Sequence, residues 1–458
     1  MMRVSEAALD LGVEHRGDNL TFTSVGTDSR NVKPGELFIA LRGEHFDAHQ
    51  HIAAAQAAGA IAAVADVAGA PLAPAGMPLI TVNNTRSALT QLAHAWRSRF
   101  SLPLVALTGS SGKTTVKEML AAILREHAGD AVLATRGNLN NEIGVPLMLL
   151  ELNASHRYAV IELGMNHSGE ISRLTQLARP DVALINNAGR AHIEHLGSEE
   201  AIARAKGEIF EGLSSQGVAV INADDAYAAL WHKLFNKNKY LRFGIEQPAD
   251  ISARYTLHAT ASEMMITAPT GSVNVTLNAP GLHNVRNALA ACAAAVALSV
   301  PLKAIAVGLT RYSGFKGRLQ RKAAQAGATI IDDTYNANPE SVRAAIDVLA
   351  HLPGKRLLVL GDMGELGERA AACHSEIGAY ARQVGIKKLY ALGELSTLTA
   401  AAFGAGARHF ESIQALHAAV KAELAPDVTA LVKGSRFMKM ERVVDALITG
   451  EKVDSVCS

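Results

Sequence analysis

Cysteine, aromatic residues, unbalanced charge and long apolar runs are all scarce in this sequence. The 3 cysteines among 458 residues are widely spaced and form no C-x-x-C motif, which argues against a disulfide framework or a cysteine zinc site and fits a reducing compartment. Lys and Arg number 44 against 43 Asp and Glu, so the chain is too neutral for a dedicated nucleic-acid binder. Aromatics at 5% favour helices packed on sheets over an aromatic-rich β protein.

Segments typical of membrane proteins are missing as well. The first residues, M-M-R-V-S-E-A-A-L-D, carry acids and no long apolar core, so we expect no signal peptide. The alanine-rich stretch 288–300 is apolar but shorter than a membrane span. We therefore expect a cytoplasmic protein without membrane insertion. Separately, we expect it to be a monomer.

What the chain does contain is a series of short apolar runs, each ending in a polar residue or glycine and followed by helical periodicity. Runs of this kind are buried on both faces and are typical of parallel strands in α/β sheets. They lie at 102–109, 158–164, 181–187, 217–225, 329–333, 356–362, 388–393 and 428–434.

These runs predict an α/β fold of three domains, which agrees with about 150 residues per domain. We expect a small N-terminal α/β domain at 1–83, a central P-loop ATPase domain on a parallel sheet at 84–314, and a Rossmann-like C-terminal domain at 315–458. The turn-rich segment 311–318 is interpreted as the linker into the third domain.

Polar and charged residues that could bind a ligand or take part in catalysis stand where the apolar runs end. Ligands of open parallel sheets bind at the carboxyl ends of the strands. The alternative, that strands simply end in polar loops, explains one or two of these positions more easily than all of them. The positions are Thr108, Glu162, Asn187, Asn222, Asp333 and Lys433.

The segment T-G-S-S-G-K-T-T (108–115) predicts a phosphate-binding loop between a strand and an amphipathic helix. Lys113 would reach the β- and γ-phosphates, and the Thr114 hydroxyl would face Mg²⁺. Leu107 occupies the usual position of the first glycine, so a glycine turn at a helix cap is the alternative. The cofactor-binding residues of the loop would be Gly109, Ser110, Ser111, Gly112, Lys113, Thr114 and Thr115.

With this loop in place, the ordered motifs of the chain resemble the Mur ligase family of peptidoglycan synthesis. After the loop come T-R-G-N-L-N-N-E-I-G-V-P, I-E-L-G, N-N-A-G-R-A-H, A-K-G-E-I, P-G-L-H-N-V-R-N-A-L-A-A and G-R, which together span residues 135–318. The resemblance implies ATP and Mg²⁺ as cofactors and an acyl-phosphate route to a new amide bond.

One branch of the family fits best. The motifs Y-N-A-N-P-E-S, G-D-M-G-E-L-G and V-K-G-S-R (335–436) resemble the branch that adds D-Ala-D-Ala to UDP-MurNAc-tripeptide. T-D-S-R (27–30) resembles a UDP-binding domain that this branch shares with the tripeptide-forming one. Phe437 and Leu196 depart from the usual pattern, which leaves details of the substrate pocket open.

The resemblance also assigns catalytic and metal-binding roles. Lys113, His192, Lys206 and Arg318 would be catalytic, and Thr114 and Glu162 would be magnesium ligands together with His192 and, once carbamylated, Lys206. Glu194 and His195 beside His192 raise zinc as an alternative, but their spacing makes an unconvincing zinc set. An ordinary helix lysine is the alternative at Lys206.

Nucleotide contacts are implied on two domains. Asn284 and Asn287 would contact adenine, and Asp333 with Asn336 would contact the ribose, while Arg318 would meet the γ-phosphate after domain closure. A helix N-cap is the alternative role for Asn284.

Three groups of residues would bind the other substrates. Precursor contacts are implied at Asn138 and Asn141, and uridine diphosphate contacts at Thr27, Ser29 and Arg30. The carboxylate of the dipeptide would meet Lys433, Ser435 and Arg436. Polar turns are the alternative for the last two groups.

Other functions remain as hypotheses. The chain resembles the tripeptide-forming Mur ligase, which would prefer a free diamino acid, and the folate polyglutamate ligases, which should lack T-D-S-R. A nucleotide-binding scaffold without ligase activity is disfavoured because Glu162, His192, Lys206 and Arg318 are all present. A motor ATPase fits poorly because the spacing of the phosphate loop is wrong for one.

Overall fold

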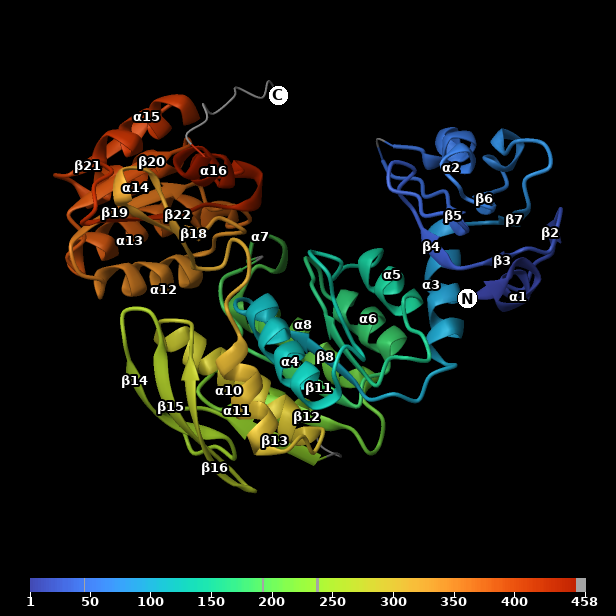
Figure 1. The fold of residues 1–458 in the computed structure, drawn as a ribbon, viewed down its shortest axis with the longest axis horizontal. Helices are drawn as coiled ribbons and strands as arrows, with labels where there is room; N and C mark the ends of the chain where they lie inside the picture. Colours follow the sequence, from blue (N-terminus) through green and yellow to red (C-terminus); the bar gives the residue numbers. More distant parts are fainter. Residues whose placement is uncertain (45, 192, 236–238, 450–458) are drawn as a thin grey trace.

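The computed structural model describes residues 1–44, 46–191, 193–235 and 239–449 as three lobes (Figure 1). The N-terminal lobe lies at the right of Figure 1, the central lobe below, and the C-terminal lobe at the upper left. The predicted boundaries at 83 and 314 fall between β7 and α3 and between α11 and β17, respectively.

The N-terminal domain contains a five-stranded sheet in the order β2-β7-β6-β5-β4. β2 pairs antiparallel with β7 and the remaining pairs are parallel. A separate antiparallel pair, β1 with β3, lies beside helix α1. The elements are β1 (Met2–Arg3), α1 (Val4–Asp10), β2 (His15–Arg16), β3 (Thr21–Phe22), β4 (Ser24–Gly26), β5 (Glu36–Ile39), α2 (Ile52–Ala57), β6 (Ala62–Asp66) and β7 (Leu79–Val82).

Helix α3 (Thr85–Arg97) joins the N-terminal and central domains. Asn84 caps it, because its side chain accepts a hydrogen bond from the Ser87 amide. The indole of Trp96 donates to the Leu152 carbonyl at 2.9 Å, and the amide of Gln91 donates to the Asp10 carbonyl at 3.0 Å. Since α3 contacts both neighbours in this way, it anchors the N-terminal domain to the central one.

The central domain contains a six-stranded parallel sheet in the order β13-β12-β11-β8-β10-β9. From β8 the chain crosses to the edge strand β9 and returns to β10 between them. It then continues on the other side of β8 with β11, β12 and β13, so the strand order reverses at β8. Open sheets bind ligands at such a point. The strands are β8 (Leu104–Thr108), β9 (Val132–Ala134), β10 (Tyr158–Glu162), β11 (Val182–Ile185), β12 (Val218–Asn222) and β13 (Lys239–Phe243).

Helices cover both faces of this sheet. On one face, α4, α10 and α11 form a single apolar core with the strands. On the other face, the strands pack against α3, α5, α6 and α8. The helices are α4 (Lys113–Ala128), α5 (Gly144–Leu150), α6 (Glu170–Ala178), α7 (Ile193–Leu196), α8 (Glu199–Gly207), α9 (Ala228–Leu234), α10 (Leu282–Ala297) and α11 (Leu302–Arg311).

A three-stranded antiparallel sheet on the central domain was not anticipated from the sequence. It consists of β14 (Ser252–Leu257), β15 (Ser262–Ala268) and β16 (Gly271–Leu277), and it lies beside α10 and α11 in Figure 1. Buried and exposed residues alternate along β15, as in a sheet with one face on the core. Short alternating segments like these give a weaker signal than continuous apolar runs.

The C-terminal domain contains a six-stranded mixed sheet in the order β17-β18-β22-β19-β20-β21, in which β17 pairs antiparallel with β18. The other pairs are parallel, in keeping with the Rossmann-like prediction. Its elements are β17 (Gln320–Ala323), β18 (Thr329–Asp333), α12 (Pro339–Ala350), β19 (Lys355–Gly361), α13 (Ala370–Gln383), β20 (Lys388–Leu392), α14 (Ser396–Phe403), β21 (Ala407–Phe410), α15 (Ile413–Glu423), β22 (Val428–Lys433) and α16 (Glu441–Thr449).

The predicted three-domain α/β architecture is confirmed. Each predicted apolar run contains a strand, and the predicted linker spans the gap between α11 and β17. Within the described part of the chain, no helix is long and apolar enough to cross a membrane.

Candidate active site

The predicted phosphate-binding loop connects β8 to α4. Gly112 has φ 78°, a left-handed conformation that favours glycine, and a Cβ there would lie 2.3 Å from Asn287 Oδ1. The loop therefore needs glycine both for its backbone angle and for the close approach of α10. Helix α4 begins directly after it at Lys113, so its N-terminus points toward the loop.

Lys113 is folded over its own loop. Its ammonium donates to the Gly109 carbonyl at 2.7 Å. Burial lowers the pKa of Lys113, the charge of Glu162 opposes that shift, and Arg318 adds to it. These two electrostatic effects indicate that Glu162 and Arg318 both lie close enough to Lys113 to act on its charge.

Amide side chains that follow β11 hold the loop from its other side. Asn186 Nδ2 donates to the Ser111 carbonyl at 2.9 Å and to Asn287 Oδ1 at 3.0 Å. The Ser111 amide in turn donates to Asn187 Oδ1 at 2.8 Å. Because these bonds fix the backbone before any ligand binds, the loop is preorganised.

Glu162 ends β10 and its side chain is buried. Its Oε1 accepts a hydrogen bond from Asn140 Nδ2 at 2.9 Å, while Oε2 is buried without a hydrogen-bond partner in the described structure. A buried, uncompensated carboxylate oxygen is costly unless a cation or donor meets it. The donor chemistry therefore fits magnesium, with the hydroxyl of Thr114 as a second oxygen on the adjacent loop.

Arg318 reaches the phosphate loop from the C-terminal domain. Its Nη2 lies 3.5 Å from Thr114 Oγ1, and its guanidinium stacks over the Tyr335 ring at 4.3 Å. Among the described residues, Arg318 Nε is buried with no hydrogen-bond partner. The arginine is thus held by an aromatic face, and its Nε–H donor is unused.

Lys206 lies in the last turn of α8 and is 1% exposed. Burial lowers the pKa of Lys206 well below its usual 10.5, and repulsion from Lys113 adds to this, while Asp225 opposes it. A neutral, buried amine is the form that reacts with carbon dioxide, so this environment is compatible with the carbamate implied by the resemblance.

Asn284 and Asn287 lie on the buried face of α10, beside the loop. Gly281 is the N-cap of this helix, so the alternative that Asn284 caps it is wrong. Asn284 Nδ2 instead donates to the Pro280 carbonyl at 2.8 Å, one turn back. Asn287 bonds to Asn186 and lies next to Gly112, so it contacts the phosphate-binding loop, whereas neither Asn284 nor Asn287 lines the cavity described below.

The positions at the ends of β18 and β22 are already bonded to each other. Lys433 Nζ pairs with Asp333 Oδ2 at 2.7 Å and donates to the Asn336 carbonyl at 2.8 Å. Ser435 Oγ donates to the Ala337 carbonyl at 3.1 Å. In this conformation Lys433 and Ser435 shape the backbone beside the site, whereas Asn336 lines the cavity itself.

A cavity of about 840 Å³ lies at the carboxyl ends of the central strands, between the central and C-terminal domains. It is large enough for a nucleotide and a second substrate. The cations and acids that line it come from both domains, as do the amides of Asn138, Asn141 and Asn336. The charged residues are Lys113, Glu162, Glu170, Lys316, Arg318, Asp332, Glu365, Arg436 and Glu441.

At one end of this cavity, Arg436 pairs with Glu441 at 2.9 Å and keeps its side chain 62% exposed. Of the three residues predicted to receive the dipeptide carboxylate, it is the one on the cavity wall. A guanidinium held by a single carboxylate can still bind a second one.

Thr27, Ser29 and Arg30 do not join this cavity. They follow β4 in the N-terminal domain, where Arg30 Nε pairs with Asp28 Oδ1 at 2.8 Å and the arginine side chain is 85% exposed. Hydrogen bonds from Arg30 lower the pKa of Asp28 to about 2. The predicted uridine contacts are therefore separate from the ATP site in this conformation.

His192 lies outside the described residues, so its predicted catalytic and metal-binding roles stay predictions. Its neighbours Glu194 and His195 belong to α7. In the described ranges, no group of three or more His, Cys, Asp or Glu side chains could hold a metal ion.

Several residues of the site were missed by sequence reasoning. Asn140 orients Glu162, and Tyr335 supports Arg318. Asn338 caps α12 and also contacts the phosphate loop, since its Nδ2 lies 3.2 Å from Ser111 Oγ. Asn140 and Asn338 belong to motifs already singled out, N-L-N-N and Y-N-A-N-P-E-S, but nothing in those motifs says which asparagine faces inward.

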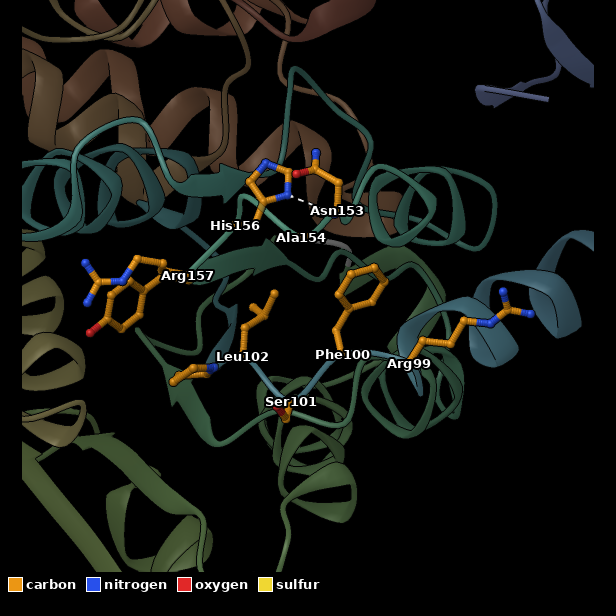
Figure 2. Close-up of a pocket in the computed structure, with 10 residues that line it drawn as sticks. Arg99, Phe100, Ser101, Leu102, Asn153, Ala154, His156 and Arg157 are labelled. Atoms are coloured by element: carbon orange, nitrogen blue, oxygen red, sulfur yellow. Dashed lines mark hydrogen bonds between the residues drawn. The ribbon is translucent and has the colours of Figure 1, made fainter. Parts of the chain in front are cut away.

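A second hollow, of about 460 Å³, lies at the amino ends of β8 and β10, away from the strand ends that form the site (Figure 2). Figure 2 shows Arg99 and Arg157 extending away from it. Arg99 pairs with Asp10 at 2.7 Å and lies over the Trp96 ring. Its cation therefore serves the junction with the N-terminal domain.

Comparison with known proteins identifies similar domains along most of the chain. Residues 107–295 match the family model for the Mur ligase middle domain, and residues 317–436 match that for the Mur ligase glutamate ligase domain. Residues 21–97 match the model for the Mur ligase family catalytic domain.

Individual relatives are similar over nearly their full length. The chain is 43% identical over 441 residues to the UDP-N-acetylmuramoyl-tripeptide--D-alanyl-D-alanine ligase of Escherichia coli K12, covering 95% of this chain and 96% of that protein. A crystal structure of MurF from Acinetobacter baumannii is 37% identical with a TM-score of 0.89, covering 97% and 98% of the two chains. MurF ligase from Thermotoga maritima in complex with ADP is 27% identical with a TM-score of 0.80, covering 94% and 98%.

Proposed function

Because this chain belongs to the Mur ligase family, we propose that it uses ATP to join D-alanyl-D-alanine to UDP-N-acetylmuramoyl-tripeptide. The product is the UDP-linked pentapeptide used in peptidoglycan synthesis. The observation that carries the proposal is the approach of Lys113, Glu162 and Arg318 to one cavity shared by two domains.

This reaction has to activate a poor acyl donor. The terminal carboxylate of the tripeptide attacks the γ-phosphorus of ATP, which releases ADP and leaves an acyl phosphate. The amine of D-Ala-D-Ala then attacks the acyl carbon, phosphate leaves, and the amine loses a proton. Catalysis of such phosphoryl transfer is mostly positioning and charge stabilisation, which suits a cavity that holds Lys113 and Arg318 beside the phosphate-binding loop.

Lys113 and Arg318 supply the positive charge in this proposal. Lys113 releases the Gly109 carbonyl and contacts the β- and γ-phosphates, while the N–H groups of the loop surround their oxygens. Arg318 Nη2 lies beside Thr114 and its Nε is unpaired, so the guanidinium can contact the transferring phosphoryl group. Both residues then stabilise the charge that develops on the oxygens during transfer.

Thr114 and Glu162 would hold Mg²⁺, with His192 and a carbamylated Lys206 as ligands of a second ion. When bound, magnesium neutralises phosphate charge and aligns the reacting oxygens. Asn140 contributes by orienting Glu162 so that one carboxylate oxygen faces the cavity. This arrangement supports the assignment because it gives the orphaned carboxylate oxygen a partner.

The remaining residues are assigned to the nucleotide, the precursor and the dipeptide. Asn284 and Asn287 would meet adenine, Asp333 and Asn336 the ribose, and Asn138 with Asn141 the precursor peptide. Thr27, Ser29 and Arg30 would bind the uridine diphosphate, and Arg436, supported by Lys433 and Ser435, the carboxylate of the dipeptide. Since ATP and nucleotide-linked precursors are made inside the cell, the proposal places the reaction in the cytoplasm, with one chain as the functional unit.

Phosphate release with ATP, Mg²⁺, UDP-MurNAc-tripeptide and D-Ala-D-Ala tests the proposal when each component is omitted in turn. Release should require all four, and the product should gain the mass of the dipeptide less water. Equal release without the dipeptide would point to another function. Turnover of the UDP-dipeptide with a free diamino acid would instead identify the tripeptide-forming reaction.

A further inference from the structure

Arg190 extends from the central domain to the C-terminal domain. It lies in the loop after β11, one residue beyond Gly189. The Gly189 amide donates to Ser110 Oγ at 2.9 Å, and that hydroxyl donates to the Gly189 carbonyl at 3.1 Å. Because Ser110 belongs to the phosphate-binding loop, the backbone that carries Arg190 is tied to that loop.

The guanidinium of Arg190 contacts carboxylates from two helices of the C-terminal domain. Nε donates to Glu340 Oε1 at 2.7 Å, and Nη1 donates to Glu376 Oε2 at 2.9 Å. Glu340 lies in the first turn of α12 and Glu376 lies in α13. Arg343 of α12 also donates to Glu376, so these charges form a network rather than an isolated pair.

This network lies next to contacts that assemble the site. Asn338, two residues before Glu340, contacts Ser111 of the phosphate-binding loop. Gly189 also packs against Glu340, since a Cβ on that glycine would lie 3.4 Å from the Glu340 carboxyl carbon. The N-terminus of α12 is therefore held over the phosphate-binding loop by contacts that lie next to the bond between Arg190 and Glu340.

We propose that Arg190, through Glu340 and Glu376, is a positioning residue that holds the C-terminal domain closed over the phosphate-binding loop. We call these three residues the Arg190 clamp. The kinetic consequence of the clamp rests on the proposed ligase function, whereas its effect on domain closure does not.

The physical basis is a difference between the open and closed states. Single exposed ion pairs contribute little to stability. Here one planar guanidinium binds two carboxylates and is only 18% exposed, a geometry that is stronger and more specific. Since the partners lie on different domains, these bonds are lost on opening, and the clamp shifts the equilibrium toward the closed state.

Small-angle scattering of the full-length, nucleotide-free protein tests the structural part. Arg190→Ala should give a larger radius of gyration than the wild type. Arg190→Lys keeps the charge but lacks the planar guanidinium that binds two carboxylates, so it should give an intermediate radius. The control is Lys388→Ala, which removes an ion pair with Glu423 at 2.5 Å entirely within the C-terminal domain and should leave the radius unchanged. Unchanged scattering in Arg190→Ala would overturn the clamp.

Steady-state kinetics test the catalytic part. If the closed state is less populated, the apparent KM for ATP should rise about 5- to 30-fold in Arg190→Ala, because apparent affinity scales with the competent fraction. The combined change Glu340→Gln and Glu376→Gln should have a similar effect and add little in the Arg190→Ala background. Additive losses would mean that Arg190 acts elsewhere, and would overturn the clamp.

The two proposals can fail separately. A wild-type protein that shows no ligase turnover but still expands on Arg190→Ala would reject the proposed function and support the clamp. Loss of turnover in Arg190→Ala without any change in scattering would support the ligase and reject the clamp.

Discussion

The predicted ATP end and the predicted uridine end of this ligase are built in different ways. At the ATP end, Lys113, Glu162 and Arg318 are buried or partly buried around one cavity, and asparagines fix the loop beneath them. At the uridine end, Arg30 is 85% exposed and paired with its neighbour Asp28. The first region is preorganised, whereas the second would have to exchange the Arg30–Asp28 ion pair for the proposed uridine diphosphate.

The two regions differ in how much free energy they lose in becoming ordered when a ligand binds. A preorganised site loses little on binding, because its groups are already ordered and desolvated. An exposed turn loses conformational entropy when it binds a ligand, and it gains affinity mainly from new charge-assisted hydrogen bonds. Substitutions at the two ends should therefore change different kinetic constants.

The largest effect is expected for Lys113→Ala, which removes a cation from the preorganised phosphate-binding loop. Phosphate release should fall by about 10³-fold or more, since this charge acts on the transferring phosphoryl group. Binding of the UDP precursor, measured by calorimetry, should stay unchanged. Retained turnover would reject the assignment of the phosphate-binding loop.

A smaller but still large effect is expected for Glu162→Gln. The amide keeps the shape of the carboxylate but lacks its charge, so the Mg²⁺ concentration for half-maximal rate should rise about 10- to 100-fold. Titration of phosphate release with Mg²⁺ at saturating ATP measures this shift. An unchanged magnesium dependence would remove Glu162 from the ligand set.

At the other end, Arg30→Ala should raise the KM for UDP-MurNAc-tripeptide about tenfold, the loss of one charge-assisted contact. The KM for ATP should not change, because Arg30 lies apart from the ATP cavity. Asp28→Ala is the matched control, since it frees Arg30 without removing it. Equal shifts in both KM values would contradict the separation of the two ends.

The smallest expected effect is on stability. The lowered pKa of Lys206 means that between its folded value and 10.5 the unfolded chain binds a proton that the folded chain does not. The contribution of Lys206 to the free energy of unfolding therefore rises with pH through this window. In carbon dioxide-free buffer, Lys206→Met should melt at a higher temperature than the wild type, and the gap should narrow toward pH 10.5. A gap that is independent of pH would count against a buried neutral amine.

The parts of the site that sequence could predict are local. The phosphate-binding loop and the buried face of α4, formed by Val116, Met119, Leu120, Ile123 and Leu124, follow from neighbouring residues, and the structure has that face buried. Lys117 stands next to Val116 in the sequence, off this apolar face. It is nevertheless buried, because its ammonium donates to the Thr135 carbonyl at 2.6 Å on the segment after β9.

The parts that sequence could not predict depend on contacts between distant segments. Asn338 meets Ser111 across 227 residues, and Arg190 meets Glu376 across 186. The resemblance implies that Lys433 meets the carboxylate of the dipeptide, yet β18 lies beside β22, and Asp333 at the end of β18 pairs with Lys433. Periodicity specifies which residues are buried on an element but not which elements become neighbours.

The attachment of the linker between α11 and β17 has a mechanical consequence. Tyr312 belongs to the apolar core of the central domain, and the Phe315 ring lies 5.4 Å from the ammonium of Lys117 on α4. If the C-terminal lobe swings, the pivot sits here, within a few residues of Arg318. That arginine would travel a short arc and stay near Thr114, whereas α15, at the far side of the lobe in Figure 1, would sweep a long one. A probe on α15 would be the more sensitive gauge of rotation.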